Sequence, residues 1–142
     1  MWFVAERIFI DTSVLVYAHD RDVGEKHAIA EHVLRQLWAD KAGALSVQVL
    51  QEFYVNVTRK FAKQLSDEQI LLATRTLGRL RVVEVSVQMI FSAIGLARQF
   101  RLSFWDSLIL EAALESQCKL LLTEDLQHGQ RIGSLTIENP FL

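Results

Sequence analysis

The stretch 7-RIFIDTSVLVY-17 predicts the fold, because it reads as a short strand that passes directly into a helix. The strand ends in a carboxylate, Asp11. Short apolar runs of this kind recur along the chain, and longer amphipathic segments separate them. This alternation is typical of a mainly parallel sheet covered by helices. We therefore expect an α/β fold.

The same patterns locate the other elements. Ser66 precedes an acidic first turn and is a good helix N-cap. Strands are expected at Arg7–Ile10, Ala44–Ser46, Val82–Val85, Leu120–Thr123 and Leu135–Ile137. Helices are expected near Ser13–Ala18, Lys26–Ala39, Val47–Phe61, Asp67–Leu80, Val87–Phe100 and Phe104–Ser116.

The composition is that of a folded globular protein. The chain has 142 residues, 51% of them hydrophobic and 23% charged, which argues against disorder and favours one domain over 1–142. With 15 basic and 17 acidic residues, the net charge of −2 provides no overall attraction to nucleic acid. A polyanion would have to be held by a local basic patch or a metal ion.

The chain shows no sign of export or membrane insertion. Charged Glu6 and Arg7 interrupt the start, MWFVAERIFID, so it is no signal peptide. No apolar run approaches the roughly 18 residues of a membrane span. A single cysteine, Cys118, excludes an internal disulfide and favours a reducing compartment. We expect a soluble, cytoplasmic protein.

Two aspartates follow predicted strands. Asp11 ends the first, and Asp125 lies just past 119-KLLLT-123. Each has a simple structural role open to it, as a helix N-cap for Asp11 and as a turn or cap residue for Asp125. If the two strands are parallel neighbours, however, both carboxylates lie at the carboxyl edge of the sheet, where ligands of open α/β sheets bind.

A third aspartate lies in the apolar segment 103-SFWDSLILEAAL-114. Asp106 shares a helical face with Ile109, Leu110 and Ala113. The pattern Ser103-x-x-Asp106 is a candidate capping box. A cap stabilises a helix by about 1 kcal/mol, whereas burying an unpaired carboxylate costs several. Capping is therefore a sufficient role only if Asp106 stays partly hydrated.

Carboxylates gathered at one sheet edge would repel one another. A pair about 4 Å apart costs roughly 4 kcal/mol at an effective dielectric near 20, so such a cluster favours a bound cation. Oxygen ligands without a nearby His/Cys set indicate Mg²⁺ or Mn²⁺ rather than zinc. Glu52 is less clear. It lies opposite the apolar stripe of 47-VQVLQEFYVNVTRKF-61, and periodicity alone favours a solvated face.

Four segments together resemble the PIN-domain ribonucleases, in particular the VapC-type toxins of toxin–antitoxin pairs. The segments are 10-IDTSVLVY-17, 46-SVQVLQEFY-54, 103-SFWDSLILEAA-113 and 121-LLTEDLQHGQ-130, and the match spans nearly the whole chain. The resemblance implies a three-layer α/β/α sandwich with a mainly parallel sheet. It also implies an acidic pocket that holds Mg²⁺ or Mn²⁺, endonucleolytic cleavage of RNA, a cognate antitoxin and a homodimer.

Carried over by position, the family's catalytic and metal-binding acids are Asp11, Glu52, Asp106 and Asp125, so the resemblance moves Glu52 into the site. Thr12, Ser13 and Thr123 match its hydroxyl positions. Ser13 or Thr123 either positions a metal-bound water or serves as a cap or turn residue. Glu124 is expected to face away from the acids.

Substrate and partner contacts stay open. The basic residues Arg59, Lys60, Lys63, Arg98 and Arg101 either contact the RNA backbone or are ordinary solvated charges. Trp2, Trp38, Tyr54 and Phe61 either line an antitoxin groove or pack in the core. Two alternatives to an RNA-cleaving enzyme remain: a non-catalytic RNA- or protein-interaction domain that kept the acidic pocket, and a metal-dependent phosphatase.

Overall fold

The structure is a computed structural model that describes residues 6–142. Its strands form a single sheet in the order β3-β2-β1-β4-β6-β5. The strands span Ile8–Ile10 (β1), Gly43–Ser46 (β2), Arg81–Val83 (β3), Leu120–Leu122 (β4), Arg131–Ile132 (β5) and Leu135–Glu138 (β6). All pairs are parallel except β5 with β6, which confirms the predicted mainly parallel sheet.

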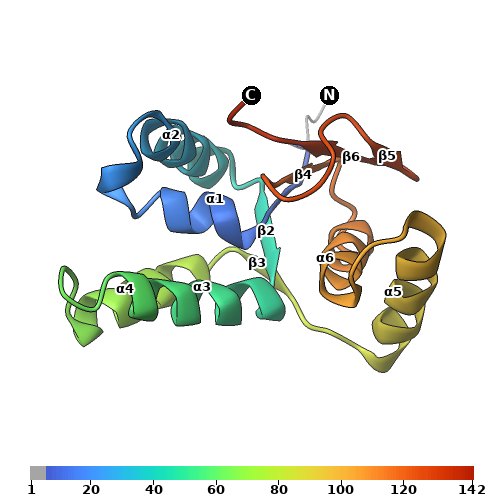
Figure 1. The fold of residues 1–142 in the computed structure, drawn as a ribbon, viewed down its shortest axis with the longest axis horizontal. Coiled ribbons are helices and arrows are strands. Elements are labelled where there is room, and N and C mark those ends of the chain that lie inside the picture. Colours follow the sequence, from blue (N-terminus) through green and yellow to red (C-terminus); the bar gives the residue numbers. More distant parts are fainter. Residues whose placement is uncertain (1–5) are drawn as a thin grey trace.

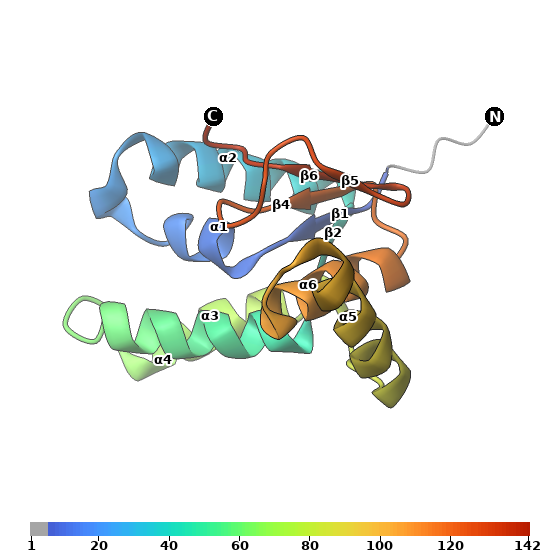
Figure 2. The same cartoon turned by 45° about the vertical axis from the view of Figure 1, so that its right-hand side comes forward.

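Pairs of helices connect the first four strands along the chain. They span Thr12–Tyr17 (α1), Glu25–Asp40 (α2), Val47–Lys60 (α3), Asp67–Leu77 (α4), Val87–Phe100 (α5) and Phe104–Glu115 (α6), with a 3-10 turn at Arg21–Val23. In Figures 1 and 2, α2 and α6 lie on opposite sides of the strands, and α5 packs on the outside of α6. The α/β/α architecture is therefore confirmed.

Helices α1 and α3 begin at the carboxyl ends of β1 and β2 and extend beyond them. Helix α1 lies between α2 and α3, and α4 packs on α3 (Figure 1). This arrangement leaves the start of α1 and one face of α3 beside the ends of β1 and β4. The acidic residues of the sequence lie in that region.

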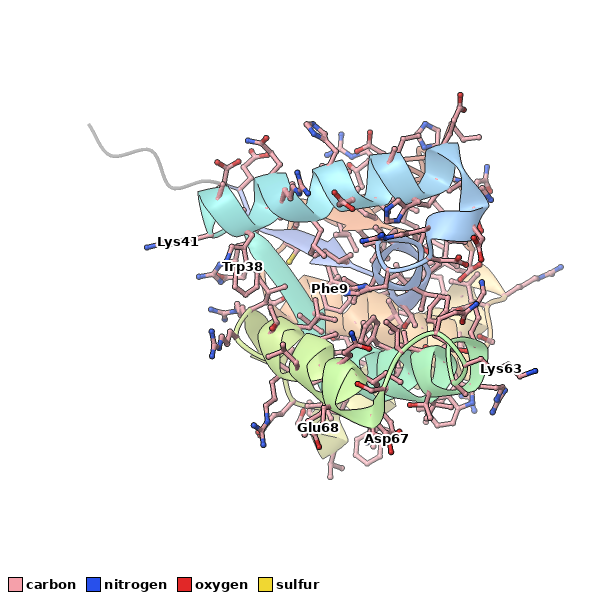
Figure 3. All side chains as sticks on the ribbon, turned by 90° about the vertical axis from the view of Figure 1, so that its left-hand side faces the viewer. Phe9, Trp38, Lys41, Lys63, Asp67 and Glu68 are labelled. Atoms are coloured by element: carbon pink, nitrogen blue, oxygen red, sulfur yellow. The ribbon has the colours of Figure 1, made fainter. Side chains whose placement is uncertain are left out.

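The central strands are apolar because both of their faces are covered. The segments 8-IFI-10 and 120-LLL-122 supply the middle of the sheet, as expected for parallel strands with helices on both sides. Phe9 is fully buried. Figure 3 shows it between α2 and α4, while the side chains of Lys41, Lys63 and Glu68 project outward.

Serine side chains begin several helices. Ser46, Ser66, Ser86 and Ser103 precede α3, α4, α5 and α6, and each accepts a hydrogen bond from the backbone N–H three residues later. The predicted N-cap at Ser66 is confirmed. Gln69 completes a capping box there, because its side chain accepts from the Ser66 N–H at 2.8 Å.

The structure contains two short elements that the sequence did not predict, the turn Arg21–Val23 and strand β5. Both are too short to carry a periodic signal. Strand β5 forms a hairpin with β6, and Gly133 in the connecting turn has a φ of 59°, which a glycine adopts at little cost. Among residues 6–142, no helix has both the length and the apolar character needed to cross a bilayer.

Candidate active site

Asp11 occupies the junction between β1 and α1. Its side chain caps α1, with Oδ1 accepting from the Thr12 N–H at 2.7 Å. Its other oxygen, Oδ2, accepts from the Thr123 hydroxyl at 2.7 Å. The residue is only 6% exposed. The predicted cap is therefore present, but it uses one carboxylate oxygen and leaves the other to a residue more than one hundred positions away.

The pairing of β1 with β4 brings these residues together. The strands run parallel with Ile10 opposite Leu122, so the residues that follow, Asp11 and Thr123, meet at the same edge. The Thr123 hydroxyl also accepts from the Asp125 N–H at 3.1 Å. A continuous chain of hydrogen bonds thus connects Asp11 to the turn that carries Asp125.

Glu52 joins this group from the middle of α3. Its Oε2 accepts from the Thr12 hydroxyl at 3.0 Å, and its Oε1 accepts from the Gln48 amide at 2.9 Å. Gln48 also donates to the Trp105 carbonyl at 3.3 Å, at the start of α6. Periodicity alone favoured a solvated face, whereas in the structure Glu52 is half-buried and its carboxylate is bonded to Thr12 of α1.

Asp106 lies half-buried in the first turn of α6. Its N–H donates to the Ser103 hydroxyl at 3.1 Å, so the cap exists. The second half of the predicted capping box does not, because no described residue makes a hydrogen bond with the Asp106 carboxylate. This differs from Ser66 and Gln69, where both bonds are made. The carboxylate of Asp106 thus has no structural partner among residues 6–142.

Burial and neighbouring acids together raise the pKa values of Asp11 and Asp125. Burial raises the pKa of Asp11 from its ordinary 3.8 to about 6, against the opposing hydrogen bonds from Thr123 and Thr12, and the charges of Asp125 and Glu52 add to the rise. The pKa of Asp125 is raised first by burial and then by the charge of Asp106. The four acids expected from the sequence are therefore close enough to interact electrostatically. The charge of Asp106 raises the pKa of Asp125, and the charge of Asp125 raises the pKa of Asp11.

A cavity of about 560 Å³ opens beside these residues. The Ser13 hydroxyl is buried at this site without a hydrogen-bond partner among the described residues. Thr123, by contrast, is fully used in holding Asp11 and Asp125. The cavity is lined by Thr12, Ser13, Val16, Tyr17, Glu52, Asn56, Arg59, Lys60, Glu124 and Asp125.

The donor chemistry fits a hard divalent cation. Carboxylate and hydroxyl oxygens line one part of the cavity, and Arg59 and Lys60 line another. Mg²⁺ is commonly bound through one or two carboxylates together with water and substrate phosphate. Within the described part of the chain, no three His, Cys, Asp or Glu side chains form a ready-made metal site. The predicted metal set of Asp11, Glu52, Asp106 and Asp125 therefore remains a prediction.

The carboxylate of Glu124, unlike that of its neighbour Asp125, is bound by side chains of the protein. Its carboxylate accepts from the Tyr17 hydroxyl at 2.6 Å and pairs with the Lys26 ammonium at 2.5 Å. Lys26 also lies over the Tyr17 ring, with its nitrogen 5.0 Å from the centroid. Although Glu124 lines the cavity wall, its oxygens are occupied in joining the turn after β4 to α1 and α2.

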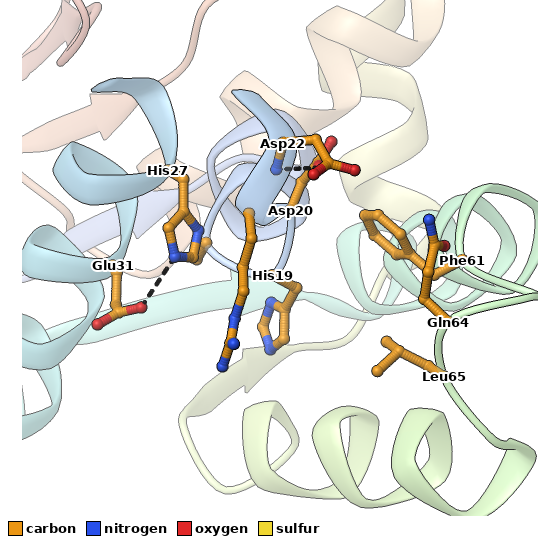
Figure 4. A pocket seen from close by; sticks show the side chains of 10 residues that line it. His19, Asp20, Asp22, His27, Glu31, Phe61, Gln64 and Leu65 are labelled. Carbon is orange, nitrogen blue, oxygen red and sulfur yellow. Dashed lines mark hydrogen bonds and ion pairs between the residues drawn. The ribbon is translucent and has the colours of Figure 1, made fainter. Parts of the chain in front are cut away.

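A second cavity, also of about 560 Å³, lies at the other end of α1 (Figure 4). His27 pairs there with Glu31 at 3.1 Å, and the Nδ1 atoms of His19 and His27 lie 2.8 and 3.0 Å from backbone carbonyls. Asp20, only 3% exposed, pairs with the Lys60 ammonium at 2.8 Å. Sequence reasoning did not single out Asp20, because its cation lies 40 residues away on α3.

Comparison with known proteins gives the following likenesses. Residues 8–131 match the family model of the PIN domain. The toxin VapC20 of Mycobacterium tuberculosis, described as cleaving the sarcin–ricin loop, aligns with a TM-score of 0.60 and 21% identity, over 80% of this chain and 86% of that chain. No curated protein matches the sequence.

Two assemblies are similar over more of the chain. A toxin–antitoxin complex from Klebsiella pneumoniae gives a TM-score of 0.67 with 17% identity, over 94% of this chain and 97% of that chain. VapBC2 from Rickettsia felis, bound to a DNA fragment from its promoter, gives a TM-score of 0.66 with 23% identity, over 93% and 97%. At these identities the likeness concerns the fold.

Proposed function

Because this chain belongs to the PIN-domain family, we propose that it is a metal-dependent endoribonuclease that hydrolyses RNA phosphodiesters, and that it is the toxin of a toxin–antitoxin pair. The predicted family is confirmed, and it supports nuclease activity. The observation that carries the proposal is Asp11, a buried carboxylate with a raised pKa whose hydrogen-bond partners among residues 6–142 are all neutral donors. Carboxylates with such perturbed pKa values cluster at functional sites.

The chemistry divides among the acids. A bound Mg²⁺ or Mn²⁺ supplies charge stabilisation at the scissile phosphate and a more acidic water. Asp11, Asp106 and Asp125 are the proposed ligands. Thr123 and the Thr12 N–H hold the Asp11 oxygens in one orientation and favour the ionised form. Glu52, fixed by Thr12 and Gln48, is the proposed group that orients the attacking water.

The proposed partner is an antitoxin that binds the groove between α2 and α4. This groove has a volume of about 650 Å³, and its lining includes Trp38 and Leu72, which are 40% and 65% exposed. Large exposed apolar side chains of this kind mark protein-binding surfaces. Phe61 is buried and takes no part, Tyr54 is exposed outside the groove lining, and Trp2 lies outside the described residues.

A homodimer is proposed on a separate surface. Val87, Phe91 and Trp105 are 66%, 60% and 63% exposed on α5 and at the start of α6. These side chains form an apolar surface that a second copy would cover. The proposed location is the cytoplasm, where an RNA target and an antitoxin would both be present.

The test is cleavage of purified single-stranded RNA by the purified protein in Mg²⁺. We expect cleavage that EDTA abolishes, and loss of about 100-fold or more in rate for Asp11→Asn. Asp67→Asn, which removes an exposed acid from the first turn of α4, is the matched control and should cleave normally. Equal cleavage by wild type and Asp11→Asn would contradict the proposal. Release of phosphate from a phosphomonoester without RNA cleavage would favour the phosphatase alternative.

A further inference from the structure

One face of α3 changes from acidic to basic along the cavity wall. Glu52, Asn56 and Arg59 follow one another at spacings of four and three residues, so they share that face, and all three line the cavity. Glu52 lies beside Asp11 through the Thr12 hydroxyl. Arg59 is seven residues further on, about 10 Å along the helix axis.

The two basic residues of the cavity wall differ in what they contact. Lys60 is paired with the buried Asp20 at 2.8 Å, so its charge is already compensated. Arg59 is exposed and has no acidic partner within 4.0 Å among the residues that the structure describes. A substrate phosphate can therefore bind Arg59 without displacing an existing ion pair.

Asn56 keeps the space between the two charges polar. Its amide donates to the Glu52 carbonyl at 2.8 Å, so the side chain lies along the helix. The cavity thus offers carboxylates at one end and a guanidinium at the other, without an ion pair between them. An RNA strand that lies along this wall presents the scissile phosphate to the acids and a neighbouring phosphate further along.

Resting on the proposed ribonuclease function, we infer that Arg59 binds the phosphate next to the scissile one and thereby sets where the RNA strand lies. Because the backbone of Arg59 lies about 10 Å along the helix axis from that of Glu52, and Asn56 lies between them, the guanidinium and the acids can engage different phosphates of one strand. The guanidinium binds phosphate through two parallel N–H donors, whereas the Lys60 ammonium is held by Asp20. Arg59 is therefore a substrate-contacting residue, and Lys60 is a structural one.

The experiment uses an RNA oligonucleotide that the wild-type protein cuts at one bond. Each phosphate is replaced in turn by an uncharged methylphosphonate, and kcat and KM are measured for wild type, Arg59→Gln and Arg59→Lys. On unmodified RNA we expect Arg59→Gln to raise KM about tenfold with kcat within about twofold of wild type. Arg59→Lys should recover part of the loss, because the charge remains but the paired donors do not.

The modified RNAs locate the contact. At one position beside the cut bond, methylphosphonate should raise KM for wild type and have no further effect on Arg59→Gln, since both changes remove the same interaction. The slope of log KM against log salt should also fall by about 0.7 in Arg59→Gln, the value for one phosphate of a single strand. Lys63→Gln, an exposed cation that projects outward in Figure 3, is the matched control and should match wild type.

Three outcomes would overturn the inference. Arg59→Gln could match Lys63→Gln in KM, its effect could add independently to every methylphosphonate, or its main effect could fall on kcat. Each is read with wild type cutting the RNA normally, so the ribonuclease proposal survives. A wild-type protein that cuts no RNA contradicts the proposed function itself and the inference with it. Equal melting temperatures for the variants confirm that folding is unchanged.

Discussion

Two buried aspartates stand at the two ends of α1, and the fold treats them in opposite ways. Asp20, after the helix, has the Lys60 ammonium 2.8 Å away, which lowers its pKa. Asp11, before the helix, has only hydroxyl and N–H donors, and burial raises its pKa to about 6. Both residues also cap the element that follows them. The cap therefore explains the presence of an aspartate at each place but not the difference in charge compensation.

The difference separates a carboxylate whose charge is compensated within the protein from one whose charge is not. At Asp20 a cation is supplied by the protein, and the pair connects α1 to the end of α3. At Asp11 the neighbouring charged groups are acids, and their mutual repulsion destabilises the ionised site. The same contrast recurs in adjacent residues. Glu124 is paired with the Lys26 ammonium, whereas the negative charge of Asp106 raises the pKa of Asp125.

The largest effect on stability is expected from removing the cation of the structural aspartate. Lys60→Ala leaves the Asp20 carboxylate buried without its partner and should lower the free energy of unfolding by about 2 kcal/mol. Lys63→Ala removes a similar exposed lysine and should change it by less than about 0.5 kcal/mol. Urea unfolding at pH 7 measures both. If the two variants have the same free energy of unfolding, the ion pair between Asp20 and Lys60 does not stabilise the fold.

A smaller effect, of opposite sign, is expected at Asp11. Because the folded-state pKa of Asp11 is raised from 3.8 to about 6, folding favours its protonated form, and the contribution is lost as pH rises from about 4 through 6. Asp11→Asn lacks this titration and keeps a capping side chain. In EDTA it should therefore be more stable than wild type at pH 7, by on the order of 1 kcal/mol, with the difference shrinking toward pH 4.

Magnesium should reverse that order at pH 7. A cation that binds the folded acidic site stabilises wild type in proportion to its occupancy, whereas Asp11→Asn should gain little. Thermal unfolding at a series of MgCl₂ concentrations gives this result directly. A melting temperature of wild type that does not respond to Mg²⁺ would count against the metal site, whatever the pH profile shows.

The smallest effect on stability is expected at Asp106. Its carboxylate makes no capping bond, so Asp106→Ala should change the free energy of unfolding by less than about 0.5 kcal/mol, whereas Gln69→Ala opens a complete capping box and should cost about 0.5–1 kcal/mol. The two are compared by urea unfolding. If Asp106→Ala is the more destabilising, its carboxylate supports the helix, and a role as metal ligand loses its main argument.

The sequence was most informative where local patterns suffice. Asp11 and Asp125 follow short apolar strands, and the parallel pairing of those strands places both residues at one edge of the sheet. The N-cap at Ser66 was equally clear, because an acidic first turn follows it. Such features depend on neighbours within a few residues, which is the range over which periodicity and capping rules operate.

The remaining parts depend on contacts between distant segments. Helical periodicity predicted a solvated Glu52, because periodicity carries no information about the contact that Glu52 makes with Thr12 of α1. The capping box at Ser103 and Asp106 matched the pattern but is only half formed. Asp20 was overlooked because its burial and its ion pair are both set by α3. In each case the tertiary partner, rather than the local sequence, decides the role of the carboxylate.

The central position of β1 has a consequence for the order in which this chain folds. Helices α1 and α3 can pack early, because they are close in the sequence, and they bring Thr12 to Glu52. The bond from Thr123 to Asp11 closes a loop of more than one hundred residues and waits until β4 has docked against β1. During synthesis, therefore, the growing chain carries half of its acidic site for most of its length. The contact between Asp11 and Thr123 is therefore expected to form late, after the contacts that are local in the sequence.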